Sequence, residues 1–356
     1  MQPGCLVAGE ICDALPDAVD PLALSLNENP FPPLPSVRSA LIRSVCAANR
    51  YPEFLPERLR DVIAGHIGVP ADRVVLGAGA TGVVLQALQA LTAPGDTMVM
   101  ASPTFDGYPI VAHLARLNSS LVALDEHGHN DLDALADAAT AARVVVLCRP
   151  HNPTGTLEPT AAVFRFLRRV PRDTVVLLDE AYIEFTAPEH RFDVAALVAR
   201  FPNVVVVRTF SKAYGLAGLR IGYAAASPEL APTLWSQQVP FGIPITGLLA
   251  VAASYDAENE LARRIRLITA ERRYLRMRLS AMGIYTTDAH ANFMYLPSPT
   301  GGRDGRRRPW REVFGDSGPR VRYYADGGAR ITVGGRASTT AVLSAMGKAT
   351  LGLQVR

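Results

Sequence analysis

The stretch VVVVRTFSKAYGLAGLRIGY, residues 204–223, decides the fold and points to the site. Its four consecutive valines are typical of a strand that is buried on both faces of a parallel sheet. A polar turn containing Lys212 follows, and a second apolar run begins at Ile221. Open α/β sheets bind their ligands at the carboxyl ends of strands, and the sequence places Lys212 at such an end.

A lysine in a loop is usually a surface residue, but Lys212 has polar neighbours. Thr209 and Ser211 supply hydroxyl donors and Arg220 a positive charge, a set that suits a phosphate group beside the amine. Desolvation at such a position lowers the pKa of an amine and makes it a nucleophile toward an aldehyde. We therefore interpret Lys212 as a candidate catalytic residue.

Around this stretch, from about residue 50 to residue 226, apolar strands alternate with amphipathic helices. This alternation predicts an α/β domain with a mostly parallel sheet covered by helices. The helices are expected at Thr81–Leu91, Leu132–Ala141 and Ala161–Arg169. The expected strands are Arg73–Leu76, Thr97–Ala101, Ser119–Leu124, Arg143–Cys148, Thr174–Leu178, Val204–Arg208 and Ile221–Ala225.

The pattern changes after Pro244. A long helical stretch, Ile245–Met282, is expected to break near Asp256, and short strands with a final helix from Ser338 follow it. We divide the chain into an N-terminal segment (1–48) that packs with the small domain and the active site, a large α/β domain (49–250) and a small α+β domain (251–356). Within the N-terminal segment a helix is expected from Ser36, capped by the serine hydroxyl.

Asp179, in TVVLLDEAYIEF, ends another apolar strand. A carboxylate there must be paired or lie in a polar site, because burying it alone is costly. One interpretation is a helix N-cap. The other is functional, since a carboxylate facing a pyridine nitrogen keeps that ring protonated. Tyr182 lies three residues on, near enough to reach the same ligand if this stretch is helical.

Two loops complete the candidate site. Asn152 lies in a sharp Asn-Pro-Thr-Gly turn just after the strand that ends at Cys148, and its amide can donate to a ligand. GAGATG, residues 77–82, leads from a strand into a helix, where free backbone N–H groups bind anions. Its GxGxxG spacing is by itself only weak evidence for a nucleotide-binding loop. The P-loop lysine is absent, and Asp96 precedes the next strand instead of ending it as a dinucleotide fold requires.

The composition and charge of the chain limit the classes of partner that it is expected to bind. The chain has 356 residues, of which 49% are hydrophobic, and a net charge of +3, so we expect no nucleic-acid or membrane binding. The basic run 303–311 is interpreted as a solvated loop. We expect no signal peptide, no membrane span and a cytoplasmic location. The cysteines have no metal-ligand spacing and are expected to be reduced, with no metal site: Cys5, Cys12, Cys46 and Cys148.

With these residues in place, the sequence from Leu24 to Gly334 resembles the fold-type I aminotransferases that depend on pyridoxal 5′-phosphate (PLP), and among them the histidinol-phosphate aminotransferase-like branch. The resemblance implies a large domain with a mostly parallel seven-stranded sheet flanked by helices, and a smaller α+β domain. The motifs that carry it are NENP (27–30), NRYP (49–52), PTF (103–105), HNPTG (151–155), DEAY (179–182), TFSKAYGLAGLRIGY (209–223), ANF (291–293) and RITVG (330–334).

The resemblance also implies residue roles. Lys212 would hold PLP covalently through its amine and then move the proton of the substrate. Asp179 would pair with the ring nitrogen, Asn152 and Tyr182 would hold the ring hydroxyl, and Phe105 would stack on the ring. The phosphate would be bound by Ala80, Thr81, Thr209, Ser211 and Arg220. Two departures stand out, since Ala80-Thr81-Gly82 lacks the usual acid and the stacking residue is more often Tyr.

Substrate and partner expectations follow from the same resemblance. Arg330 would bind the acidic group of the substrate through its guanidinium fork, with Arg322 and Asn29 as further contacts. The protein would be a homodimer with shared active sites, in which Tyr51 reaches the phosphate bound by the neighbouring subunit.

The resemblance leaves several functions open. The leading expectation is amino transfer between L-histidinol phosphate and 2-oxoglutarate, in histidine biosynthesis. The second is an aromatic amino acid aminotransferase, favoured by FPPLPSV (31–37). The third is a threonine-phosphate decarboxylase of cobalamin synthesis, although the NxNPLG-type opening is absent. A non-catalytic PLP-fold module would have lost Lys212 or Asp179, and both are present.

Overall fold

The computed structural model describes residues 20–299 and 308–351, and the side chains up to residue 347. Three sequence expectations lie wholly or mostly outside these ranges: the absence of a signal peptide, the state of Cys5 and Cys12, and the basic run 303–311. Within the described residues, no helix is both long and apolar enough to cross a lipid bilayer.

The larger sheet has seven strands in the order β1-β7-β6-β5-β4-β2-β3. All neighbours are parallel except β7, which runs antiparallel to β1 and β6. The predicted α/β architecture is therefore confirmed. The strands are β1 (Val74–Ala78), β2 (Thr97–Ser102), β3 (Asn118–Ala123), β4 (Val144–Cys148), β5 (Val175–Asp179), β6 (Val204–Thr209) and β7 (Ile221–Ala226).

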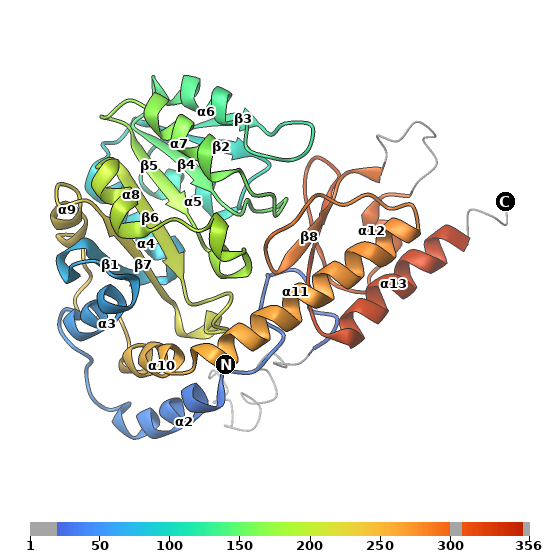
Figure 1. Ribbon diagram of the computed structural model, residues 1–356, viewed down its shortest axis with the longest axis horizontal. Helices are drawn as coiled ribbons and strands as arrows, with labels where there is room; N and C mark the ends of the chain where they lie inside the picture. Colours follow the sequence, from blue (N-terminus) through green and yellow to red (C-terminus); the bar gives the residue numbers. More distant parts are fainter. Residues whose placement is uncertain (1–19, 300–307, 352–356) are drawn as a thin grey trace, which may run out of the picture.

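Helices cover both faces of this sheet (Figure 1). Alternate side chains of a strand point to opposite faces. Val145 and Leu147 of β4 therefore join one core cluster, and Val144 and Val146 join the other. The first core includes α2 (Pro35–Ser44), α3 (Glu57–Ile67), α6 (Leu132–Ala139), α7 (Thr160–Arg169), α8 (Val194–Arg200) and α10 (Ile245–Tyr255). The second core includes α4 (Gly79–Leu91), α5 (Gly107–Leu114) and α9 (Ala231–Trp235).

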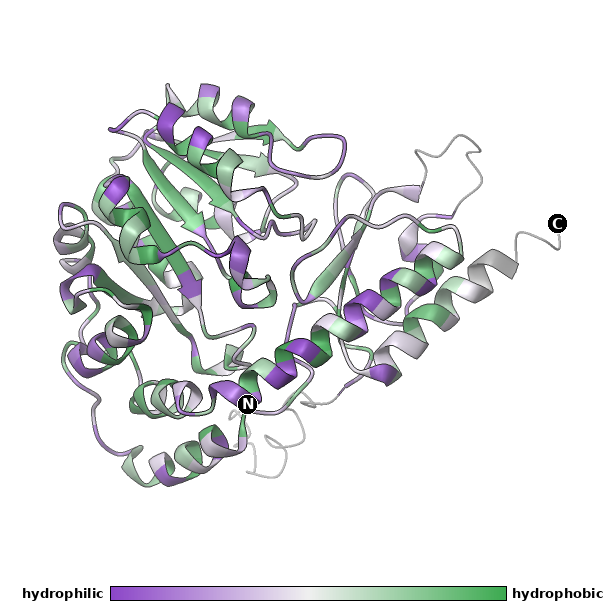
Figure 2. Ribbon diagram, viewed as in Figure 1, coloured by the Kyte–Doolittle hydropathy of each residue, from purple (hydrophilic) through white to green (hydrophobic). Residues whose placement is uncertain are grey.

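Hydropathy follows this layering, since the central strands are apolar and polar residues gather on the outer helices (Figure 2). The start of α2 differs from the expectation. The helix begins at Pro35 with no side-chain cap, and the Ser36 hydroxyl donates to the carbonyl oxygen of Ala253 at 3.2 Å. The expected Ser36 cap is therefore wrong. Proline suits the first helical position because the N–H it lacks would have no partner there.

A second sheet has the order β8-β10-β9, with β8 (Phe293–Leu296), β10 (Ala329–Thr332) and β9 (Arg322–Tyr323). The long helix α11 (Glu258–Ala281) extends from beside α10 to this sheet, with α12 (Trp310–Phe314) and α13 (Arg336–Leu351) nearby (Figure 1). The break expected near Asp256 thus separates α10 from α11. The domain boundaries near residues 48 and 250 stay a prediction.

The segment Ala23–Asn29, which we call the N-terminal strap, joins the second sheet to the loops of the first. The N–H of Leu24 donates to the carbonyl oxygen of Arg320 at 2.9 Å. The N–H of Thr332 donates to the carbonyl oxygen of Leu24, also at 2.9 Å. Farther along, the Asn29 side chain reaches the turn that carries Lys212. The strap therefore connects Arg320 and Thr332, which lie 296 and 308 positions after Leu24, with the turn that carries Lys212.

Candidate active site

Lys212 lies in the turn between β6 and β7, as expected. Phe210 is fully buried and anchors this turn, and Gly215 adopts a left-handed conformation with φ of 69°. The Lys212 ammonium donates to the carbonyl oxygen of Leu26 at 3.0 Å. The pKa of Lys212 is lowered to about 8, chiefly by burial and in part by the charge of Arg330. An amine with this pKa is neutral often enough near pH 7 to act as a nucleophile.

Asp179 ends β5 and is buried. One carboxylate oxygen accepts the N–H of Ala181 at 2.9 Å, and the other accepts the hydroxyl of Tyr108 at 2.5 Å. Burial raises the pKa of Asp179, whereas the two hydrogen bonds and the charge of Lys212 oppose this rise. No α-helix begins at Asp179, because a short 3-10 turn at Ile183–Phe185 follows. The N-cap interpretation is therefore wrong, and the carboxylate lies in a polar site.

Asn152, Tyr182 and Arg330 form one buried network. The Asn152 amide donates to the Tyr182 hydroxyl at 3.2 Å, and Arg330 Nη1 donates to the amide oxygen of Asn152 at 2.5 Å. Asn27, in the strap, donates to the same hydroxyl at 3.0 Å. Burial raises the pKa of Tyr182, so the phenol keeps its proton. The hydroxyl accepts two hydrogen bonds and retains that proton for a ligand.

The loop at Gly79–Thr81 begins α4 and faces Arg220. The first N–H groups of a helix have no partner within the helix and bind anions. Arg220 Nη1 lies 3.4 Å from the Ser211 hydroxyl, and Thr209 donates to that hydroxyl at 3.0 Å. A Cβ on Gly79 would lie 2.4 Å from Arg220 Nη2. Glycine therefore lets the guanidinium and the loop approach each other, and the set is suited to a phosphate.

Phe105 lies beside this loop. Together with Ala80, Thr81, Tyr108 and Asp179 it lines a small cavity. The cavity thus has an anion-binding loop on one side, a carboxylate on another and an aromatic ring at its wall. The two departures noted in the sequence leave these features in place, because the loop binds through backbone N–H groups and Phe105 supplies an aromatic face.

Three expected site residues, Arg322, Asn29 and Tyr51, have other partners or are exposed to solvent. Arg322 is the cross-strand partner of Arg330 in the β9–β10 register, but its guanidinium pairs with Asp106 at 2.9 Å in a half-exposed position. The Asn29 amide donates to the carbonyl oxygens of Lys212 and Ala213 at 3.1 and 2.9 Å, so it holds the lysine turn. Tyr51 is 82% exposed. Substrate contacts for Arg322 and Asn29 stay predictions.

Two functional residues were missed by the sequence reasoning, Asn27 and Tyr108. Asn27 is the first residue of the NENP motif, whose role was unassigned, and the structure shows that its side chain holds Tyr182. Tyr108, the second residue of α5, follows Phe105 by three residues, a spacing that places two side chains on the same side of a helical turn. That spacing was a usable signal for Tyr108.

Tyr108→Phe is expected to lower kcat about tenfold or more, with little change in KM, because a hydrogen bond to a charged group is lost. That bond favours the ionised carboxylate, so its loss raises the pKa of Asp179 further. The acid side of the pH–rate profile should therefore move to higher pH. Tyr295→Phe is the control, since it removes another tyrosine–aspartate bond, to Asp326 at 2.5 Å. Equal pH shifts in both variants would contradict this role of Tyr108.

An amine, a carboxylate and an anion-binding loop at the strand ends of an α/β sheet define the class of the protein: an enzyme that holds a phosphorylated aldehyde cofactor. Residues 19–303 match the family described as aminotransferase class I and II, and the chain belongs to this family. The cofactor of the family is PLP, and the residues described above fit it.

Relatives of similar length support this membership. An aromatic amino acid aminotransferase of Cutibacterium acnes is 41% identical over 330 residues, which are 92% of each chain. One of Streptomyces avermitilis is 41% identical, over 89% of this chain and 88% of its own. The crystal structure of histidinol-phosphate aminotransferase from Sinorhizobium meliloti, in complex with PLP, matches 93% of this chain and 91% of its own with a TM-score of 0.84 and 26% identity.

Proposed function

We propose that this chain is an aromatic amino acid aminotransferase, which passes the amino group of an aromatic amino acid to a 2-oxo acid. The observation that carries the proposal is the 41% identity to relatives of that name across nearly the whole chain. These relatives favour the second of the sequence expectations over the first. We place the activity in the cytoplasm, in keeping with the free thiols of Cys46 and Cys148.

In this proposal PLP, when bound, draws electrons from the substrate α-carbon. The side chains of the protein bind the cofactor and the substrate and move the proton. Lys212 Nζ would accept the proton of that carbon and deliver it to the cofactor carbon that receives the amino group. Asp179 would keep a negative charge toward the ring nitrogen. Asn152 and Tyr182 would bind the ring hydroxyl, and Phe105 would supply an aromatic face for the ring. The phosphate would be bound by Ala80, Thr81, Thr209, Ser211 and Arg220.

Arg330 binds the substrate carboxylate. Its Nη1 and Nη2 groups are engaged by Asn152 and by the carbonyl oxygen of Ser25, which fixes the plane of the guanidinium. Its Nε is buried and has no partner among the described residues. A buried donor without an acceptor is costly, so an incoming carboxylate oxygen there would relieve that cost.

Amino transfer from histidinol phosphate is the second candidate. The structural similarity to the Sinorhizobium meliloti enzyme supports it. So does the position of Arg322 across from Arg330, because a second guanidinium beside the first suits a phosphate, provided that Asp106 releases it.

A half-reaction screen tests the proposal. PLP-loaded protein is mixed with phenylalanine, histidinol phosphate or threonine phosphate, and the absorbance change that accompanies amination of the cofactor is followed. We expect phenylalanine to react about 100-fold faster than histidinol phosphate, the range that side-chain discrimination reaches. Faster reaction with histidinol phosphate would select the second candidate. Release of carbon dioxide from threonine phosphate would contradict aminotransferase function.

We also propose that the chain works as a homodimer. Tyr51 and Phe241 have ring centres 4.9 Å apart, and Phe54 contacts the same Phe241 ring at 5.2 Å. These rings and Val239 are 43–82% exposed, so they form an apolar surface that a second copy would cover. Tyr51 would then reach the phosphate bound in the partner. Sedimentation velocity of the PLP-loaded protein is the test, and a monomer would contradict the proposal.

A further inference from the structure

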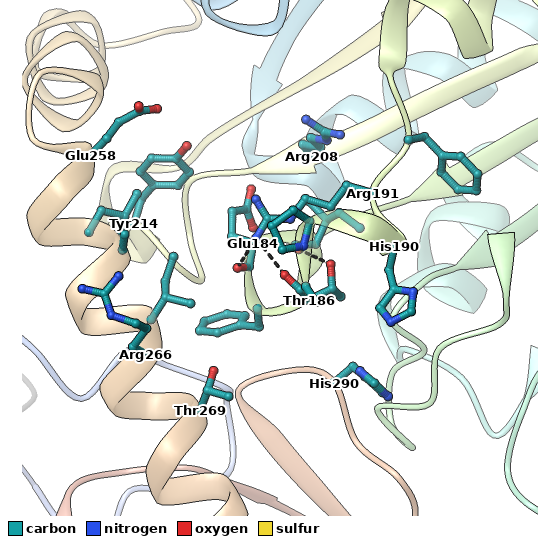
Figure 3. Close-up of a pocket in the computed structure, with 18 of the residues that line it drawn as sticks. Glu184, Thr186, His190, Arg191, Arg208, Tyr214, Glu258, Arg266, Thr269 and His290 are labelled. Atoms are coloured by element: carbon teal, nitrogen blue, oxygen red, sulfur yellow. Dashed lines mark hydrogen bonds between the residues drawn. The ribbon is translucent and has the colours of Figure 1, made fainter.

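A large cavity lies between α11 and the segment Ile183–Ala195 (Figure 3). Its volume of about 1270 Å³ exceeds what most small-molecule sites require. Neither Lys212 nor Asp179, Asn152 or Arg330 lines it. The cavity is thus separate from the active site, and we call it the α11 cleft.

Arginines outnumber acidic residues in the walls of the α11 cleft, six to four. Two of them have acidic partners, because Arg208 pairs with Glu180 and Arg276 with Asp288. Arg191 has bonds only to backbone carbonyl oxygens in the described chain, those of Glu184 at 3.0 Å and Thr186 at 2.8 Å (Figure 3). Arg191 thus has no ion pair with a carboxylate among the described residues, although its charge acts on the nearby Glu184 carboxyl and lowers the pKa of that group.

The face of α11 that lines the cleft adds two more unpaired cations. Arg266, Thr269 and Arg273 follow one another at helical spacing and all line the cleft. Arg266 and Arg273 are exposed and make no hydrogen bond or ion pair with any residue that the structure describes. Two guanidinium groups thus border the cleft with a threonine between them.

The positive charges of α11 also repel one another. Arg272 is buried and donates to the carbonyl oxygen of Ala291. The pKa of Arg272 is lowered to about 10, chiefly by burial and in part by the charges of Arg273 and Arg276, with Asp288 opposing. A bound anion would relieve this repulsion, as a salt-bridge partner does.

We propose that the α11 cleft binds a small phosphate-bearing molecule, whose phosphate is held by Arg266 and Arg273 of α11 with Arg191 opposite. Guanidinium groups suit this role because their planar forks match phosphate oxygens. Across the cleft, Glu184 Oε2 is buried without a partner among the described residues. A hydroxyl on the organic part of the ligand would satisfy it, which favours a phosphate ester.

Two loops connect the α11 cleft with the active site. Glu184 follows Tyr182 by two residues and Tyr214 follows Lys212 by two, and both Glu184 and Tyr214 line the cleft. The same two loops therefore carry active-site residues and cleft residues. This inference does not depend on which amino acid the enzyme uses.

The test is calorimetric titration of PLP-loaded protein with inorganic phosphate and with glycerol 3-phosphate, at constant ionic strength set by sodium chloride. We expect saturable binding in both titrations, one ligand per chain. The double variant Arg266→Gln/Arg273→Gln should raise Kd at least about tenfold, the size expected for the loss of charged hydrogen bonds. Tighter binding of glycerol 3-phosphate would assign an ester, and equal binding would assign free phosphate.

The matched control is Arg263→Gln/Arg278→Gln, which removes the same charge from α11 at residues outside the cleft. This control should bind phosphate like the unaltered protein. An equal loss in both double variants would show general charge attraction and overturn the proposal. So would an unchanged Kd in the cleft variant, because that phosphate would be bound elsewhere, for example at Arg330. Absence of saturable binding would overturn it as well.

Discussion

Lys212→Ala is expected to abolish the absorbance of the PLP-loaded protein near the visible edge and to lower turnover by at least about 10⁴-fold. The variant removes the one amine at the strand ends that faces the Asp179–Tyr182–Arg330 network, and no other described side chain there can take its place. Absorbance and single-turnover rates are the measurements. Retention of both would contradict the assignment of Lys212.

Lys348→Ala is a matched control, since Lys212 and Lys348 are the two lysines of the chain. This control should keep the absorbance and the activity. Reduction of the loaded protein with borohydride, followed by peptide mass spectrometry, should place the cofactor on the peptide that contains Lys212. Label on Lys348 would contradict the site.

The lowered pKa of Lys212 gives this experiment a pH dependence. An amine captures an aldehyde in its neutral form, and half of the amine is neutral at the pKa, which is about 8 for Lys212. Binding of PLP to the cofactor-free protein should therefore accelerate from pH 7 through pH 8 and level off about one pH unit above the pKa. An unshifted lysine would continue to gain reactivity up to its ordinary pKa near 10.4.

Asp179→Asn is expected to lower kcat about 10²–10³-fold, the effect of removing one oriented electrostatic group from an active site. The amide has nearly the same shape but no negative charge, so it cannot favour a protonated ring nitrogen. The half-reaction rate with the best amino donor is the measurement. The absorbance of the bound cofactor should persist, because Lys212 is intact.

The control for this variant is Asp326→Asn, because Asp326 also accepts a hydrogen bond from a buried tyrosine, Tyr295. It lies in the small sheet region and should leave the half-reaction within about threefold of the original rate, as surface changes usually do. If Asp179→Asn slows the reaction no more than Asp326→Asn, the charge of Asp179 has no catalytic part.

The larger sheet was predictable because its strands are continuous apolar runs. Val204–Arg208 was expected and Val204–Thr209 is observed, and the other six strands agree to within two residues. Valine and isoleucine in such runs suit a sheet buried on both faces, a local property of the sequence. Lys212, Asp179 and Asn152 could then be placed together, since the carboxyl ends of parallel strands share one edge.

The contacts that orient these residues were not predictable in the same way. The bond between Asn27 and Tyr182 joins residues 155 positions apart, and that between Tyr108 and Asp179 joins residues 71 apart. Neither contact leaves a periodic pattern in the sequence. Asn29, in the NENP motif, was likewise expected to contact the substrate, but its amide donates to backbone carbonyl oxygens of the turn that carries Lys212.

Substrate choice was hard to infer for a related reason. The segment TFSKAYGLAGLRIGY contributes the lysine turn and the phosphate-binding residues, which any member of the family needs for PLP. The residues that contact the substrate side chain carry no comparable motif. The sequence expectation therefore led with histidinol phosphate, whereas the two relatives of 41% identity reported above are aromatic amino acid aminotransferases.

The N-terminal strap affects the order in which the active site can form during synthesis. Its residues leave the ribosome before the two sheets do, but Leu24 pairs with Arg320 and Thr332, and Asn27 bonds to Thr332 and Tyr182. Contacts of such long sequence separation form late in folding. The large sheet can thus assemble while translation continues, whereas the cofactor site is complete only after residue 332 has been added. A nascent chain released before that residue would have Lys212 but would lack the strap contacts that hold Tyr182 in place.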